Sequence, residues 1–379
     1  MIYLDNSATT AVSKKAAETA SSYMNEVFFN PSSAYNAAVA VERDMKQARA
    51  HMARALAATP DEFIYTSGGT ESNNAAIFGT LKMKRTKGRV ICSAVEHPSV
   101  YEVFSVLEGM GYEVKHAPVN SDGAIDTEAL SELVTPDTLL VSLMHVNNET
   151  GAINDLEKCR KIIKSASPEA IFHSDGVQAF CKMPFVTPAC DLYSVSGHKI
   201  HAPKGIGILY IKKNTKFFGS LIGGGQERGL RSGTSNVPSI MAFDVALEDY
   251  MANREEYVRS MMNCKMRLAK NMLTLPDTVI NGCAPEVGAP HILNISFLGV
   301  RGEVLLHSLA ERGIYVSTGS ACSTHKKGNR ILDSMGIRGE RQAGAIRFSF
   351  CAHTTEAEID EASNAISEIL PQLRRFKRR

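Results

Sequence analysis

Short apolar runs alternate with helical patterns over the first two thirds of this 379-residue chain. Helical spacing of apolar residues is seen over residues 39–56 and 71–83. Strands separated by helices favour a parallel sheet covered by helices. We therefore predict an α/β fold with a mostly parallel seven-stranded sheet. The expected strands lie at residues 63–65, 90–92, 112–115, 139–144, 170–173, 192–195 and 206–211.

The pattern changes after about Asp249, where a long charged helix leads into a less regular region. Strand candidates follow at residues 293–297 and 346–350. We expect a second, smaller α+β domain here. The predicted boundaries are 15–255 for the large domain, and 1–14 together with 256–379 for the small domain.

Composition excludes several functional classes. A net charge of +2 provides no electrostatic basis for binding nucleic acid or an anionic membrane. No apolar stretch approaches the roughly 20 residues of a membrane span, and no secretory signal is visible. The eight cysteines are scattered and form no CxxC pair, which favours reduced thiols over disulfides or a metal site. We therefore expect a cytoplasmic protein without a metal.

Lys199 is the most informative single residue. It lies in the sequence Ser-Gly-His-Lys, directly after a predicted strand and before a Pro-Lys-Gly turn. A lysine held on a tight turn away from bulk water has a lowered pKa and can form a Schiff base. Taken alone, the same pattern also fits a solvated surface charge.

Polar clusters follow three other predicted strands. The glycine-rich turn at residues 67–70 precedes a helix and suits a phosphate, although a plain helix cap fits it too. His97 follows the next strand, where it could meet a ligand or simply cap a helix. Asn148 lies in an Asn-Asn-Glu-Thr-Gly turn, which Asx-turn chemistry also explains.

Asp175 closes another predicted strand, and Gln178 lies one turn further on. A buried carboxylate needs a partner, and a cofactor cation can supply one. A phosphate cradle, a stacking histidine, an aspartate and a Schiff-base lysine are together the groups that a protein offers to pyridoxal phosphate. The aspartate keeps the pyridine nitrogen protonated, so that the ring can accept electrons.

Cys322 and Arg347 add a nucleophile and an anion-binding group. Cys322 lies among small residues with two lysines shortly after it, and nearby cations favour the thiolate. Arg347 is in mid-strand, where it can bind a carboxylate through two hydrogen bonds or form an ion pair. We expect the other seven cysteines to be inert buried thiols: Cys92, Cys159, Cys181, Cys190, Cys264, Cys283 and Cys351.

Together with further motifs, these residues match one family over nearly the whole chain. The chain resembles the cysteine desulfurases of the NifS/IscS type, which are class-V aminotransferase-like, fold-type-I pyridoxal-phosphate enzymes. The matching segments are residues 4–10, 30–33, 66–74, 96–98, 147–151, 175–178, 196–199, 223–234, 319–322 and 347–349.

The resemblance implies a role for each matching residue. Lys199 would hold the cofactor covalently, His97 would stack on its ring, and Asp175 would pair with its pyridine nitrogen. Arg347 with Asn148 would bind the substrate carboxylate, and Cys322 would become a persulfide. The remaining cofactor-binding residues would be Gly69, Thr70, Asn148, Gln178, Ser196, His198 and, from a partner subunit, Thr234.

The implied activity is removal of sulfur from L-cysteine, with release of L-alanine. The implied partners are a second copy of the chain and a sulfur acceptor, either an iron–sulfur scaffold or a thiolation enzyme. Two alternatives stay open at this point. One is selenocysteine lyase or cysteine sulfinate chemistry with the same cofactor, and the other is a catalytically weak protein that carries persulfide.

Overall fold

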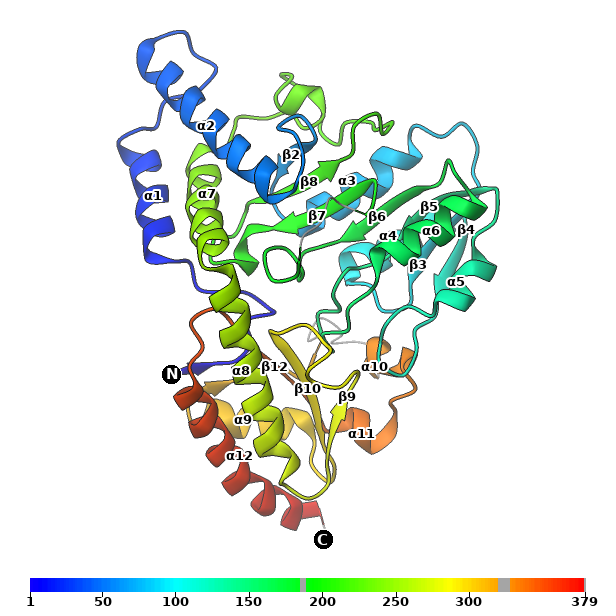
Figure 1. The fold of residues 1–379 in the computed structure, drawn as a ribbon, viewed down its shortest axis with the longest axis vertical. Coiled ribbons are helices and arrows are strands. Elements are labelled where there is room, and N and C mark those ends of the chain that lie inside the picture. The colour runs from blue at the N-terminus through cyan, green and yellow to red at the C-terminus, as the bar shows by residue number, and fades with distance from the viewer. Residues whose placement is uncertain (185–188, 320–327, 378–379) are drawn as a thin grey trace.

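A computed structural model describes residues 1–184, 189–319 and 328–377. Its centre is a seven-stranded sheet with the strand order β2-β8-β7-β6-β5-β3-β4 (Figure 1). Neighbouring strands from β7 to β4 run parallel, whereas β8 is antiparallel to both β7 and β2. The predicted mostly parallel seven-stranded sheet is thus confirmed. The strands are β2 Phe63–Thr66, β3 Arg89–Ser93, β4 Glu113–Ala117, β5 Thr138–Ser142, β6 Ile171–Asp175, β7 Leu192–Ser196 and β8 Gly207–Ile211.

Helices surround this sheet. Helix α3 packs against β6, β7 and β8, and α7 packs against α1 and α2 at one end of the sheet (Figure 1). The predicted helices at 39–56 and 71–83 correspond to α2 and α3. The helices are α1 Lys14–Asn25, α2 Asn36–Ala55, α3 Gly69–Leu81, α4 Pro98–Gly109, α5 Thr127–Leu133, α6 Leu156–Ala166 and α7 Val237–Ala252.

A smaller antiparallel sheet, with the order β12-β10-β9, occupies the other half of the molecule (Figure 1). The N-terminus joins this half, because β1 pairs with β11 and Asp5 forms a bridge with Ser349. The proposed domain boundaries remain a prediction. The elements here are β1 Ile2–Tyr3, α8 Arg254–Leu273, β9 Thr278–Asn281, β10 Ile292–Phe297, α9 Gly302–Ala310, β11 Ile314–Tyr315, α10 Arg330–Ser334, α11 Gly339–Ala343, β12 Ala345–Ser349 and α12 Glu356–Lys377.

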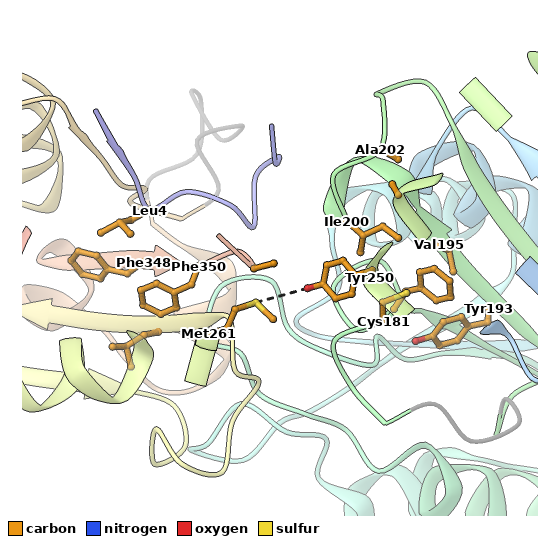
Figure 2. Close-up of a cluster of buried hydrophobic side chains, with 14 of the residues drawn as sticks. Leu4, Cys181, Tyr193, Val195, Ile200, Ala202, Tyr250, Met261, Phe348 and Phe350 are labelled. Carbon is orange, nitrogen blue, oxygen red and sulfur yellow. Dashed lines mark hydrogen bonds between the residues drawn. The ribbon is translucent and has the colours of Figure 1, made fainter. Parts of the chain in front are cut away.

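One hydrophobic core extends through both halves. Figure 2 shows Phe348 and Phe350 on the side of the small sheet, and Tyr193 and Ile200 on the side of the large sheet. All four side chains are almost fully buried. Because the two sheets share a core, residues at their facing edges keep fixed positions relative to each other.

None of the helices in the described ranges is long and apolar enough to cross a membrane.

Asp191 fixes the entrance to β7, the strand that leads to Lys199. Its buried carboxylate accepts a hydrogen bond from Arg160 Nη1 at 3.1 Å and lies 2.8 Å from Lys164 Nζ. Both cations belong to α6. The carboxylate also accepts a hydrogen bond from the Phe172 backbone N–H of β6 at 3.0 Å. One side chain therefore ties a helix to two adjacent strands.

We predict that Asp191→Asn lowers the free energy of unfolding by about 2 kcal/mol, because hydrogen bonds to a charged group are lost from a buried position. Urea denaturation measures this change. The matched control is Asp61→Asn, since the Asp61 side chain is 86% exposed and lies 3.8 Å from Arg228. Exposed pairs contribute little, so the control should change stability by less than about 0.5 kcal/mol. Equal losses in the two variants would contradict this role of Asp191.

Candidate active site

Four neighbouring parallel strands bring the predicted site residues to one edge of the large sheet. Asp175 ends β6, His97 follows β3, and Asn148 follows β5. Lys199 ends the short 3₁₀ helix η1, Gly197–Lys199, which continues from β7. Ligands of open α/β sheets bind at the carboxyl ends of such strands. This edge is therefore the candidate active site.

The Lys199 ammonium is buried and bonded to the N-terminal segment. Its Nζ donates to the backbone oxygen of Ser7 at 2.5 Å and to that of Ala8 at 2.7 Å. Both acceptors are neutral carbonyl groups. The amine is therefore held in place without a carboxylate ion pair that would stabilise its charge.

The surroundings of Lys199 favour the neutral amine. Burial, together with the positive charges of Lys182 and Arg347, lowers the pKa of the Lys199 ammonium to about 7. The carboxylates of Asp175 and Asp5 raise it but do not compensate. A large fraction of Lys199 is thus unprotonated and nucleophilic near neutral pH.

Asp175 has a buried carboxylate. Hydrogen bonds from the end of its own strand and from a neighbouring helix hold this carboxylate in place. Its Oδ1 accepts a hydrogen bond from the Val177 backbone N–H at 2.9 Å. Its Oδ2 accepts one from Asn73 Nδ2 of α3 at 2.8 Å. The next residue, Gly176, has no space for a side chain, because a Cβ there would lie 1.9 Å from Tyr193 Cζ. The carboxylate therefore keeps one orientation.

The glycine-rich turn forms a narrow cradle before α3. Gly68 has a φ of 146°, which side chains rarely allow. A Cβ on Gly69 would lie 2.7 Å from Val177 Cγ2, and one on Gly68 would lie 3.7 Å from Ser196 Oγ. Thr70 is exposed in the first turn of α3. Backbone N–H groups at this helix start, with nearby hydroxyls, suit a phosphate group.

His97 is the N-cap of α4, which is one of the two interpretations that the sequence left open. Its Nδ1 accepts a hydrogen bond from the Ser99 backbone N–H at 3.2 Å. The residue is nevertheless exposed at the site edge. Capping therefore involves one ring nitrogen and leaves the ring accessible.

The N-terminal segment lines the site, a role that the sequence analysis did not assign to it. The Ser7 backbone oxygen also accepts a hydrogen bond from Gln178 Nε2 at 2.9 Å. Thr9 Oγ1 lies 3.1 Å from His198 Nδ1. Burial lowers the pKa of His198 to about 3, so this imidazole is neutral. The only signal in the sequence was the match of residues 4–10 to a family motif.

Arg347 lies in the middle of β12 and faces the large sheet. Its Nη2 binds Asp5 Oδ1 at 2.6 Å, and its Nη1 donates to the Asn148 backbone oxygen at 3.0 Å. The buried Nε of Arg347 and the buried Oδ1 of Asn148 have no hydrogen-bond partner in the described part of the chain. Unpartnered buried polar atoms are costly. These two are therefore available to a polar ligand.

Ion pairs hold the glycine-rich segment 223–234 on its own chain, and the two shortest are partly buried. Glu227 binds Arg49 at 2.6 Å, and Arg231 binds Glu71 at 2.9 Å. Thr234 is exposed and lines a pocket of about 220 Å³ together with Ser67 of the cradle turn. The contact of Thr234 with the cofactor of a partner subunit stays a prediction.

The expectation that seven cysteines are buried holds for five of them. Cys92, Cys159, Cys181, Cys190 and Cys264 are buried, and burial raises the pKa of each thiol. The expectation was wrong for Cys283 and Cys351, which are only partly buried. Each lies two residues beyond the end of a strand, Cys283 after β9 and Cys351 after β12.

The sequence also predicts Cys322 as the nucleophile and predicts no metal site. Cys322 lies outside the described residues. Within the described ranges, no group of three or more His, Cys, Asp or Glu side chains could hold a metal ion.

Comparison with known proteins identifies the family. Residues 2–362 match the aminotransferase class-V family. The chain is 40% identical over 378 residues to a cysteine desulfurase of Nostoc sp., an alignment that covers 99% of this chain and 94% of the relative. It is 36% identical over 378 residues to the cysteine desulfurase NifS of Azotobacter vinelandii, with 98% and 93% covered. A solved NifS-like protein superposes with a TM-score of 0.92 at 36% identity, over 98% of this chain and 100% of that one. The chain therefore belongs to the class-V aminotransferase family and, within it, to the cysteine desulfurases of the NifS/IscS type.

Proposed function

We propose that this enzyme binds pyridoxal phosphate through Lys199 and uses it to remove sulfur from L-cysteine, releasing L-alanine. The observation that carries the proposal is the buried Lys199 amine with a pKa of about 7, at the same sheet edge as Asp175. When bound, the cofactor supplies an electron sink for the bonds at the substrate's Cα.

Each proposed cofactor contact uses a residue of this edge. The Asp175 carboxylate would pair with the pyridine nitrogen, and His97 would stack on the ring. The cradle at Gly69 suits the phosphate, because the turn leaves no room for a side chain: a Cβ on Gly69 would meet Val177. The other proposed contacts are Thr70, Ser196 and His198 with the phosphate, Asn148 and Gln178 with the phenolic oxygen region, and Thr234 from a partner subunit.

Arg347 and Asn148 are proposed to bind the substrate carboxylate. Arg347 already has one carboxylate partner in Asp5, and its buried Nε is still available. A second carboxylate would use that nitrogen or displace Asp5 from Nη2. The guanidinium would thereby orient the substrate and place its Cα near Lys199, which moves the Cα proton.

We propose that the substrate sulfur is transferred to Cys322. The thiolate would attack the substrate sulfur, the bond between that sulfur and the substrate carbon would break, and the sulfur would stay on Cys322 as a persulfide. An iron–sulfur scaffold or a thiolation enzyme in the cytoplasm would accept it.

We propose a homodimer as the active form, and the exposed Leu221 and Ile222 beside the glycine-rich segment support an interface there.

We predict that Lys199→Ala abolishes both the visible absorbance of the bound cofactor and alanine production from cysteine. The physical reason is that the cofactor aldehyde reacts with a neutral primary amine, which Lys199 with its pKa of about 7 offers at the sheet edge. Absorbance before and after borohydride, together with an alanine assay, measures the effect. Lys204→Ala is the matched control, because Lys204 is exposed in the same turn. Full activity of Lys199→Ala would refute the proposed function.

The lowered pKa of Lys199 predicts how cofactor capture depends on pH. Only the neutral amine attacks the cofactor aldehyde, so the capture rate should rise with pH and level off above the pKa. The midpoint should lie near 7 and not near the usual lysine value of 10.5. Stopped-flow absorbance on cofactor-free protein measures the rate. A midpoint above about 9 would show that burial does not favour the neutral amine.

We predict that Cys322→Ser still binds the cofactor but gains no sulfur. A neutral hydroxyl attacks sulfur far less readily than a thiolate does. After reaction with cysteine, mass spectrometry should find one added sulfur on the wild-type peptide that contains residue 322 and none on the variant. Cys351→Ser is the control, since Cys351 is a partly buried cysteine whose replacement should leave the labelling unchanged. Added sulfur on Cys351 in both proteins would identify a different nucleophile.

A further inference from the structure

A chain of short hydrogen bonds connects His97 to Asp175 through two residues that have no assigned role. Asn73 Nδ2 lies 2.8 Å from Asp175 Oδ2 and also 2.8 Å from Ser99 Oγ. Ser99 Oγ in turn lies 2.8 Å from His97 Nδ1. The same ring nitrogen lies 3.2 Å from the Ser99 backbone N–H. Three elements, α3, β6 and the start of α4, contribute to this chain.

The chemistry of the end groups determines the direction of every hydrogen bond. A backbone N–H can only donate, so His97 Nδ1 must accept and carries no proton. The Asp175 carboxylate can only accept, so the Asn73 atom beside it must be the amide nitrogen. That nitrogen also donates to Ser99 Oγ. The Ser99 hydroxyl therefore has its own proton free to donate to His97 Nδ1.

This direction leaves one tautomer for the neutral imidazole of His97. With Nδ1 accepting two hydrogen bonds, the proton of the neutral ring lies on Nε2. Adding a second proton would place an N–H at Nδ1 against the Ser99 backbone N–H. The hydrogen bonds therefore oppose protonation of the ring as well as selecting its tautomer.

The charges around His97 act on it from four elements. Although His97 is exposed at the edge of the site, desolvation by the surrounding protein is the largest effect on its imidazole and lowers the pKa. Asp175 at the end of β6 and Glu149 after β5 raise it, whereas Lys199 in η1 and Arg330 in α10 lower it. The net direction is downward, which agrees with the geometry at Nδ1.

We propose that Ser99 and Asn73 are positioning residues that hold His97 in the neutral form with its proton on Nε2. Asn73 is fully buried, and its amide links the tautomer of His97 to the orientation of the Asp175 carboxylate. Nε2, which bears the proton, has no hydrogen-bond partner among the described residues. His97 therefore enters the reaction as a hydrogen-bond donor at Nε2. The mechanistic consequence rests on the proposed function, whereas the tautomer itself does not.

The test is long-range ¹H–¹⁵N correlation spectroscopy on the full-length protein with labelled histidine, with and without pyridoxal phosphate. The protein has 11 histidines, so the His97 signals are assigned by their loss in His97→Asn. In the wild type, Nδ1 should show the shift of an unprotonated nitrogen and Nε2 that of a protonated one. In Ser99→Ala the backbone N–H still faces Nδ1, so the tautomer should be kept, whereas loss of the hydroxyl donor should move the Nδ1 shift and raise the pKa of His97.

Kinetics provide the second measurement. Ser99→Ala should lower kcat for alanine formation by about tenfold and shift its pH profile, and Ser99→Thr should restore both because it returns the hydroxyl. Ser105→Ala is the matched control, since Ser105 is exposed on the same helix and its Oγ donates to the Tyr101 backbone oxygen of that helix at 3.4 Å. It should behave as the wild type in both measurements.

The possible outcomes separate this inference from the proposed function. Unchanged His97 shifts in Ser99→Ala would overturn the inference, even in an active cysteine desulfurase. A protonated Nδ1 in the wild type would overturn it as well. The expected shifts in a protein that produces no alanine from cysteine would support the tautomer assignment and refute the proposed function.

Discussion

The site depends on the hydrogen bonds of one short N-terminal segment, residues 5–10. The Ser7 backbone oxygen accepts hydrogen bonds from Lys199 and from Gln178 of the large-sheet side. Its backbone N–H donates to Ser349 Oγ of the small sheet at 2.8 Å. Asp5 adds an ion pair to Arg347. Because the segment binds both halves, the lysine and the arginine are held at a defined separation across the site.

Burial at this edge determines the protonation states on which the proposed chemistry relies. The shared core excludes water from behind the site, and desolvation disfavours every cation that has no close anionic partner. Among the described residues the Lys199 ammonium donates to carbonyl oxygens and to no carboxylate, so its pKa falls. His198 loses its charge for the same reason. Arg347, by contrast, has a close anionic partner in Asp5.

Much of the fold and part of the site could be predicted, because both depend on local patterns. Apolar runs and helical spacing located the strands, and the residues directly after strands pointed to Asp175 and Lys199. Asn73 and Ser99 were missed because each looks like an ordinary helix-start residue in the sequence. Cys283 and Cys351 were wrongly expected to be buried, because the general preference of cysteine for burial does not show how a particular loop packs.

The sequence by itself determined the order of strands and helices, the residues at the strand ends and the family, since each of these is encoded in contiguous residues. Only the tertiary structure decided which groups meet. Arg347 pairs with Asp5, which lies 342 residues earlier, and Asn73 reaches Asp175 across 102 residues. The direction of the Ser99 hydroxyl depends on a contact between α3 and α4. Hydrogen bonds require atoms within about 3 Å in a suitable direction, and only the packing of helices and sheets around a common core provides that precision.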